Sequence, residues 1–125
     1  MTYTHIMTLH RFRRIARRAI ERLPDALRPY ADECMISARR RPSKKLRREL
    51  GLTDNEVLFG LYQGHMVGRQ YHAQMPPRIV LFYEALIDAC ETEKELERQI
   101  HRTVLHEIGH HFGMDEDQLA ELGYG

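Results

Sequence analysis

The clearest pattern of apolar and polar positions lies near the start of the chain, in residues 10–23, HRFRRIARRAIERL. Apolar residues recur there at helical spacing, and arginines fill the positions between them. The apolar positions are Phe12, Ile15, Ala16, Ala19, Ile20 and Leu23. The pattern predicts an amphipathic helix that ends before Pro24, because proline has no backbone N–H to continue it. Such a helix should pack its apolar side on the rest of the fold.

Three short runs rich in β-branched and aromatic residues follow, each bounded by proline, glycine or charged residues. They predict strands at 33–38 (ECMISA), 57–62 (VLFGLY) and 79–83 (IVLFY). A fourth strand is expected if residues 66–71 (MVGRQY) pair back as a hairpin. Residues 39–50, RRRPSKKLRREL, hold seven basic residues, one proline and a short helical pattern. They predict a solvated loop or surface turn.

The last third of the chain has helical character in residues 84–90, 93–112 and 116–122. The middle segment carries an apolar row at every fourth position: Leu96, Ile100, Val104, Ile108 and Phe112. Glutamates fill its first turn, and Thr92 is the predicted N-cap. One helix, a small mixed sheet of three to four strands and then helices indicate an α+β fold. The length predicts a single domain over residues 1–125.

The charge is divided unevenly along the chain, although 19 basic and 18 acidic residues nearly cancel overall. Residues 1–83 carry sixteen Lys or Arg against seven Asp or Glu, whereas residues 84–125 carry three against eleven. A basic half therefore precedes an acidic half. The total charge gives no argument for nucleic acid or membrane binding.

No stretch approaches the roughly 20 apolar residues that span a bilayer, and the first thirty residues lack a secretory signal pattern. The arginine-rich start could also be read as an organelle presequence, but it leads directly into the amphipathic helix. We therefore expect a cytoplasmic protein. Cys34 and Cys90 lack metal-site or redox-pair spacing and are expected to be reduced, buried thiols.

The candidate chemistry lies in residues 106–116, HEIGHHFGMDE. His106 and His110 fall on the side of the predicted helix opposite its apolar row. One helical turn separates them, about 6 Å between Cβ atoms, so both imidazoles can bind one tetrahedral zinc ion. Glu107 lies beside the pair and is placed to accept a proton from water as a general base. His101 and His111 fall within the apolar arc and are expected to be buried or rim residues with one hydrogen bond.

A catalytic zinc ion normally has three protein ligands, so the two histidines leave the site incomplete. Gly113 can end the helix, because glycine readily takes the left-handed conformation of a helix C-terminus. The turn would carry the following acids back toward the histidines. The candidate third ligands are Asp115, Glu116 and Asp117. Asp115 has a competing role as the N-cap of the last helix, with Gln118 three residues later.

This segment resembles the extended zincin signature H-E-x-x-H-x-x-G-x-x-H/D, with Glu116 in the position of the third ligand. The chain is most similar to the small bacterial zincin-like metallopeptidases, including a G-L-Y strand that ends here at Tyr62. The resemblance implies a minimal zincin-like fold and a Zn²⁺ ion on His106, His110 and Glu116. It also implies Glu107 as the general base of a peptidase.

Two features depart from the wider pattern. Only nine residues follow Glu116, so the methionine-containing turn of metzincins is absent, and Met114 is expected to serve packing. The third ligand is Glu instead of His or Asp, which leaves Asp115 and Asp117 as alternatives.

The sequence therefore favours a zinc metallopeptidase that hydrolyses peptides. We expect residues 78–83 (RIVLFY) to align the substrate as an edge strand, or else to form an ordinary interior strand. Tyr71, His72 and Tyr83 are the candidate oxyanion donors, and the sequence does not select among them. A third hypothesis keeps the zinc site but with latent or narrowly directed activity.

A binding module without hydrolase activity is the alternative function. It would use the basic cluster formed by Arg39, Arg40, Arg41, Lys44, Lys45, Arg47 and Arg48 on nucleic acid or an acidic partner. No aromatic residues interleave with these charges, so nucleic acid is the less favoured partner and a solvated loop the plainer interpretation. The basic half could also dock on the acidic half of another copy, and the sequence leaves the oligomeric state open.

Overall fold

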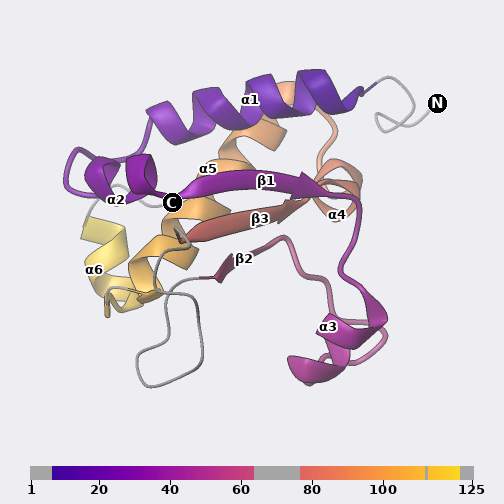
Figure 1. Ribbon diagram of the computed structural model, residues 1–125. Coiled ribbons are helices and arrows are strands. Elements are labelled where there is room, and N and C mark those ends of the chain that lie inside the picture. The colour runs from indigo at the N-terminus through magenta and orange to yellow at the C-terminus, as the bar shows by residue number, and fades with distance from the viewer. Residues whose placement is uncertain (1–6, 64–76, 112, 122–125) are drawn as a thin grey trace.

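The computed structural model describes residues 7–63, 77–111 and 113–121, without the side chains of His110, His111 and Glu116. Within these residues the chain forms six helices and a three-stranded sheet (Figure 1). The helices are α1 (Leu9–Glu21), α2 (Arg28–Glu33), α3 (Lys44–Glu49), α4 (Tyr83–Asp88), α5 (Glu93–His111) and α6 (Glu116–Glu121). The strands are β1 (Met35–Arg39), β2 (Gly60–Gln63) and β3 (Arg78–Phe82). The predicted α+β class is confirmed, while the possible fourth strand at 66–71 lies outside the described residues.

The sheet is mixed, with the order β1-β3-β2. β3 pairs in parallel with β1 and antiparallel with β2, so it is the central strand. Four consecutive β3 residues, Ile79 to Phe82, are at most 4% exposed, which fits a strand with neighbours on both sides. The prediction that residues 78–83 form an edge strand is therefore wrong, and the alternative of an interior strand holds. β2 is an edge of the described sheet, and it is the edge that contacts α5.

The hydrophobic core lies between one face of the sheet and the two long helices. Ile79 and Leu81 of β3 point to this face and are fully buried. Phe12 and Ile15 of α1 join them in the same cluster, together with the apolar row of α5. Figure 1 shows α1 running lengthwise past the sheet with α5 behind it, while α3 projects from the opposite side. The sheet and helices thus form two layers around one core.

The amphipathic helix predicted at residues 10–23 is confirmed as α1. Thr8 is its N-cap, and the Thr8 hydroxyl accepts a hydrogen bond from the Arg11 N–H at 3.1 Å. The helix ends at Glu21, before Pro24, and Leu23 is also buried. The apolar side of α1 packs on α5 and the core, as the pattern requires.

The short elements differ more from the sequence pattern. β1 begins two residues later than predicted, and only the end of the predicted strand at 57–62 forms β2. α2 was not predicted; its second residue is Pro29, which the first turn of a helix accepts because that N–H needs no helical partner. Within residues 39–50, Lys44–Glu49 form the short helix α3, which has no buried residue. The predicted surface location is confirmed, but a helix is found where a loop or turn was predicted.

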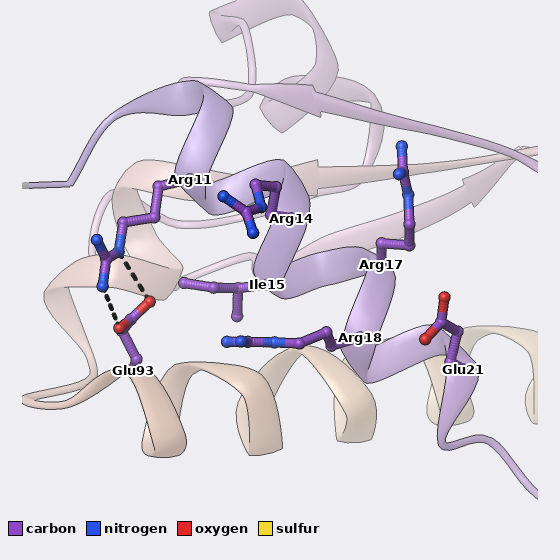
Figure 2. Close-up of a pocket in the computed structure, with 7 residues that line it drawn as sticks. All are labelled: Arg11, Arg14, Ile15, Arg17, Arg18, Glu21 and Glu93. Carbon is purple, nitrogen blue, oxygen red and sulfur yellow. Dashed lines mark hydrogen bonds and ion pairs between the residues drawn. The ribbon is translucent and has the colours of Figure 1, made fainter.

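Ion pairs join the basic half of the chain to the acidic half within one molecule. Among the described residues, five such pairs connect the two halves. They join Arg11 to Glu93, Arg18 and Arg22 to Glu97, and Arg40 and Arg41 to Glu84. Figure 2 shows Arg11 bonded to Glu93 and the Arg18 side chain lying along α5. The uneven charge of the sequence therefore has an intramolecular role.

Cys34 is half-buried and Cys90 is buried, and both are free thiols. Desolvation raises the pKa of each thiol above its usual value, and Glu33 and Glu95 respectively add to the shift. Both residues pack with the hydrophobic core. No helix in the described part of the chain is both long and apolar enough to cross a bilayer.

Candidate active site

α5 carries the first half of the HEIGHHFGMDE segment. The helix begins as predicted: the Thr92 hydroxyl accepts the Glu95 N–H at 3.1 Å. Its apolar row is fully buried at Leu96, Ile100, Val104 and Ile108, whereas Phe112 lies outside the described residues. The helix is continuous from residue 93 to residue 111, so the backbone positions of His106 and His110 are one turn apart. The core therefore fixes the rotation of the helix that presents the candidate ligands.

His106 and Glu107 are both partly buried and line one cavity of about 400 Å³. The cavity lies between α5 and the residues that lead into β2. Its lining consists of Leu58, Phe59, Gly60, Gln99, Arg102, Thr103, His106 and Glu107. An imidazole and a carboxylate beside a hollow of this size provide a site where a small polar group or part of a chain can be bound.

A backbone hydrogen bond fixes the Glu107 carboxylate. Its Oε1 atom accepts the Tyr62 N–H of β2 at 2.8 Å. The two residues are 45 positions apart, so helical spacing gave no indication of this contact. Sequence reasoning had identified Tyr62 only as the end of the G-L-Y strand. The edge strand of the sheet thus orients the residue that the motif assigns as the general base.

α5 ends at the predicted glycine. Gly113 has a φ of +78°, the left-handed conformation that terminates helices. The Met114 N–H donates to the Gly109 carbonyl oxygen at 2.8 Å, which closes the terminal turn in the Schellman pattern. Met114 packs against the core, as expected for a structural residue. α6 then contacts α5, with Leu119 over Gly109, where a Cβ atom would collide with the leucine side chain.

Asp115 and Asp117, two of the acids after Gly113 whose side chains the structure describes, have different environments. Asp115 and Gln118 cap α6 reciprocally: the Gln118 N–H donates to Asp115 Oδ1 at 2.8 Å, and the Asp115 N–H donates to Gln118 Oε1 at 2.9 Å. The predicted capping role of Asp115 is therefore confirmed. Asp117 is exposed, and Glu116 is the first residue of α6.

No group of three or more His, Cys, Asp or Glu that could hold a metal occurs among the side chains that the structure describes. Two of the three predicted ligands, His110 and Glu116, have side chains outside that description. The ligand set and the role of Glu107 therefore stay predictions.

Of the two other histidines of α5, His101 does not line the cavity. His101 is partly exposed, and its Nε2 atom donates to the Arg22 carbonyl oxygen at 3.2 Å. It is the rim residue with one hydrogen bond that its place in the apolar arc indicated. His111 is the last residue of α5, and its side chain lies outside the described residues.

Of the three candidate oxyanion donors, only Tyr83 lies within the described residues. Its ring packs against Phe12 with 5.9 Å between centroids, and it lines a separate hollow near the start of α1. Tyr83 is therefore not among the residues around His106 and Glu107, because α4 carries it toward α1. Tyr71 and His72 lie outside the described residues.

The basic cluster of residues 39–48 is partly engaged within the chain. Arg40 Nε lies 2.8 Å from Glu84 Oε2 and Arg41 Nη2 lies 3.4 Å from Glu84 Oε1. The hydrogen bond from Arg40 lowers the pKa of Glu84 below its usual value, and Arg41 contributes. Arg47 donates to the Glu56 carbonyl oxygen at 2.9 Å. Three of the seven basic residues therefore make contacts within the chain. This weakens the argument that the cluster is a dedicated binding surface.

The family model of the zincin-like metallopeptidases matches residues 31–125. Among curated proteins, no match to the chain is found. The family match includes the whole sheet, α5 with its HExxH segment, and α6, while α1 precedes it. From this match over most of its length, the chain belongs to the zincin-like metallopeptidase family.

Proposed function

We propose that the protein is a zinc-dependent peptidase in which His106, His110 and Glu116 hold the metal and Glu107 is the general base. Membership of a metallopeptidase family supports the reaction class. The observation that carries the proposal is the cavity beside α5, because His106 and Glu107 both line it. The motif requires its metal ligand and its base at one place, and the shared cavity supports these roles for the two residues.

The residues fit a zinc ion by their donor chemistry and their spacing. Two imidazoles and a carboxylate are a usual ligand set for catalytic zinc. The continuous helix from residue 93 to residue 111 keeps positions 106 and 110 one turn apart, and the turn at Gly113 reverses the chain before Glu116. Bound zinc would polarise the scissile carbonyl and lower the pKa of water toward ~7.

Glu107 would accept a proton from the attacking water and return it to the leaving amine. A general base must stay oriented toward the water molecule that it deprotonates. The Tyr62 N–H supports that requirement, because it holds Glu107 Oε1 at 2.8 Å against the edge of the sheet. With β3 in the interior, β2 is the strand of this sheet that borders the cavity, and we propose that it aligns the peptide.

The replacement Glu107→Gln tests this function. Glutamine keeps the shape and can still accept the Tyr62 hydrogen bond through its side-chain oxygen, but it cannot act as a base. We expect zinc content to stay at the wild-type level while turnover of unstructured peptides falls by about 10²–10⁴-fold. Zinc measured by atomic absorption and cleavage measured by mass spectrometry of a peptide mixture give the two values. Wild-type turnover in this variant would remove Glu107 from the mechanism.

A further inference from the structure

We infer that Gly60 is a positioning residue for Glu107, acting through the Tyr62 backbone N–H and through the close contact between β2 and α5. The inference rests on the proposed function in one respect, since it takes Glu107 to be the general base. It adds a residue on a different element, 47 positions before Glu107 in the chain, which the HExxH motif does not contain.

The register of the sheet explains why the Tyr62 N–H is available to Glu107. The Phe82 N–H donates to the Phe59 carbonyl oxygen at 2.9 Å, and the next pairs along the ladder are Gly60 with Leu81 and Leu61 with Val80. In an antiparallel ladder, hydrogen-bonded and non-hydrogen-bonded pairs alternate. Tyr62 consequently falls in a non-hydrogen-bonded pair, and its N–H points away from β3.

The Glu107 carboxylate accepts this outward N–H. The general base is therefore held by a backbone group whose direction the whole sheet determines. A backbone donor cannot rotate away as a side-chain donor can. The β2 strand is therefore a fixed reference for the position of the carboxylate.

Gly60 determines how closely α5 can approach that strand. A Cβ atom at this position would lie 2.8 Å from Thr103 Cγ2 and 3.2 Å from the Val80 carbonyl oxygen. Thr103 precedes Glu107 by four residues, so it lies one turn away on the same side of α5. Any side chain at position 60 would push against the helix directly beside the base.

Thr103 cannot readily move out of the way. It is 9% exposed, and its hydroxyl donates to the Gln99 carbonyl oxygen at 2.8 Å. Its branched Cβ also restricts the side chain to few rotamers. The absence of a side chain at Gly60 thus permits the helix-to-strand distance at which Glu107 reaches the Tyr62 N–H.

The experiment compares four proteins loaded with zinc: wild type, Gly60→Ala, Thr103→Ser and the double variant. Serine removes only Cγ2 and keeps the hydroxyl that bonds to Gln99, so it opens space for the alanine methyl group. We expect Gly60→Ala to keep its zinc but to lose about 10–100-fold in kcat with KM nearly unchanged, because a shift of about 1 Å misplaces a catalytic group. Thr103→Ser gives the reference value for the double variant, and the double variant should recover most of the kcat that Gly60→Ala loses.

Hydrogen exchange of the Tyr62 amide gives a second measurement that does not depend on turnover. Gly60→Ala should accelerate its exchange relative to neighbouring β2 amides, and the double variant should restore protection. Should Gly60→Ala fold poorly, its thermal stability tests the same contact. The double variant, which lacks Thr103 Cγ2, should then recover the stability that Gly60→Ala loses.

Two results would overturn the inference. One is full kcat in Gly60→Ala when the wild type is active and Glu107→Gln is not. This result would leave Glu107 as the base and remove only the positioning role. The other is unchanged exchange of the Tyr62 amide in Gly60→Ala, which would refute the geometric argument whatever the activity. Failure of the proposed function is recognised separately, by wild-type turnover in Glu107→Gln.

Discussion

Asp115 and Glu116 are adjacent acids, and the side chain of Asp115 is the one of the two that the structure describes. Asp115 Oδ1 accepts the Gln118 N–H, so one of its oxygens is engaged in capping α6. An acid that caps a helix contributes to stability through a backbone donor that would otherwise lack a partner. Because Asp115 has this capping role, we keep Glu116 as the proposed third metal ligand.

Alanine substitutions should separate the two roles. Asp115→Ala should lower the free energy of unfolding by about 1 kcal/mol, within the 0.5–2 kcal/mol range for lost N-caps, and leave zinc affinity unchanged. Glu116→Ala should weaken zinc binding without a similar loss of stability in the metal-free protein. Urea denaturation and a competitive zinc titration measure the two quantities, with Asp117→Ala as a control that changes neither. Loss of zinc in Asp115→Ala with normal binding in Glu116→Ala would transfer the ligand role to Asp115.

At the scale of elements, the turn between α5 and α6 depends on the conformation of Gly113. Its φ of +78° is unfavourable for residues that carry a Cβ atom. We expect Gly113→Ala to lower stability by roughly 1–2 kcal/mol and Gly113→Asn to lower it less, because asparagine tolerates this region better. Thermal unfolding followed by circular dichroism compares the three proteins. An alanine variant as stable as the wild type would contradict this account of the turn.

The long helices could be predicted from sequence because their apolar rows repeat over three or more turns. α1, α5 and their N-caps Thr8 and Thr92 depend on contacts within a few residues of one another, although only Thr92 was identified in advance. The capping of α6 was predictable for the same reason. α2 escaped prediction because it has six residues and buries only Ala31, too few positions to show a period.

The order of the strands and the hydrogen bond that holds Glu107 could not be predicted, because both depend on contacts between residues distant in sequence. Nothing in the run at 78–83 distinguishes a central strand from an edge strand, and here pairing with both β1 and β2 decides it. The Tyr62–Glu107 hydrogen bond likewise depends on how α5 lies against β2. The sequence thus indicated His106 and Glu107 as neighbours on one helix but not the strand that completes their surroundings.

At the scale of the whole molecule, ion pairs near the surface link the two oppositely charged halves. The hydrogen bond from Arg11 lowers the pKa of Glu93 below its usual value of 4.5, as Arg40 does for Glu84. A carboxylate with a lower pKa in the folded state stabilises the fold above about pH 4.5. That contribution is lost as the pH falls through the folded-state pKa.

Acid should therefore weaken the contact between the halves. We expect the urea midpoint to fall as the pH is lowered below about 4.5, and to fall less in the double variant Glu84→Gln, Glu93→Gln. The difference between the proteins should be small, since exposed pairs contribute little, and should shrink further in 1 M NaCl, at about 3 Å Debye length. Urea titrations from pH 7 to pH 3 measure it. If the urea midpoint of the double variant fell equally or more steeply with acid, the ion pairs of Glu84 and Glu93 would be excluded as the source of the acid sensitivity.

Helix α1 also belongs to the core of the whole molecule, although it precedes the residues matched by the family model. Phe12 and Ala19 of this helix are fully buried in the core, and α1 packs along α5. The helix that carries His106 is therefore supported from one side by the sheet and from another by α1. This support explains how a chain of 125 residues can hold the candidate site on a fixed helix.

The most direct test of the account is the zinc content of protein purified without chelator, compared between the wild type and His106→Ala. His101→Ala is a matched control, because His101 lies on the same helix but makes its hydrogen bond to the Arg22 carbonyl oxygen. The account predicts about one zinc ion per chain in the wild type and in His101→Ala, and far less in His106→Ala. Equal zinc content in His106→Ala, or none in the wild type after growth with added zinc, would contradict it.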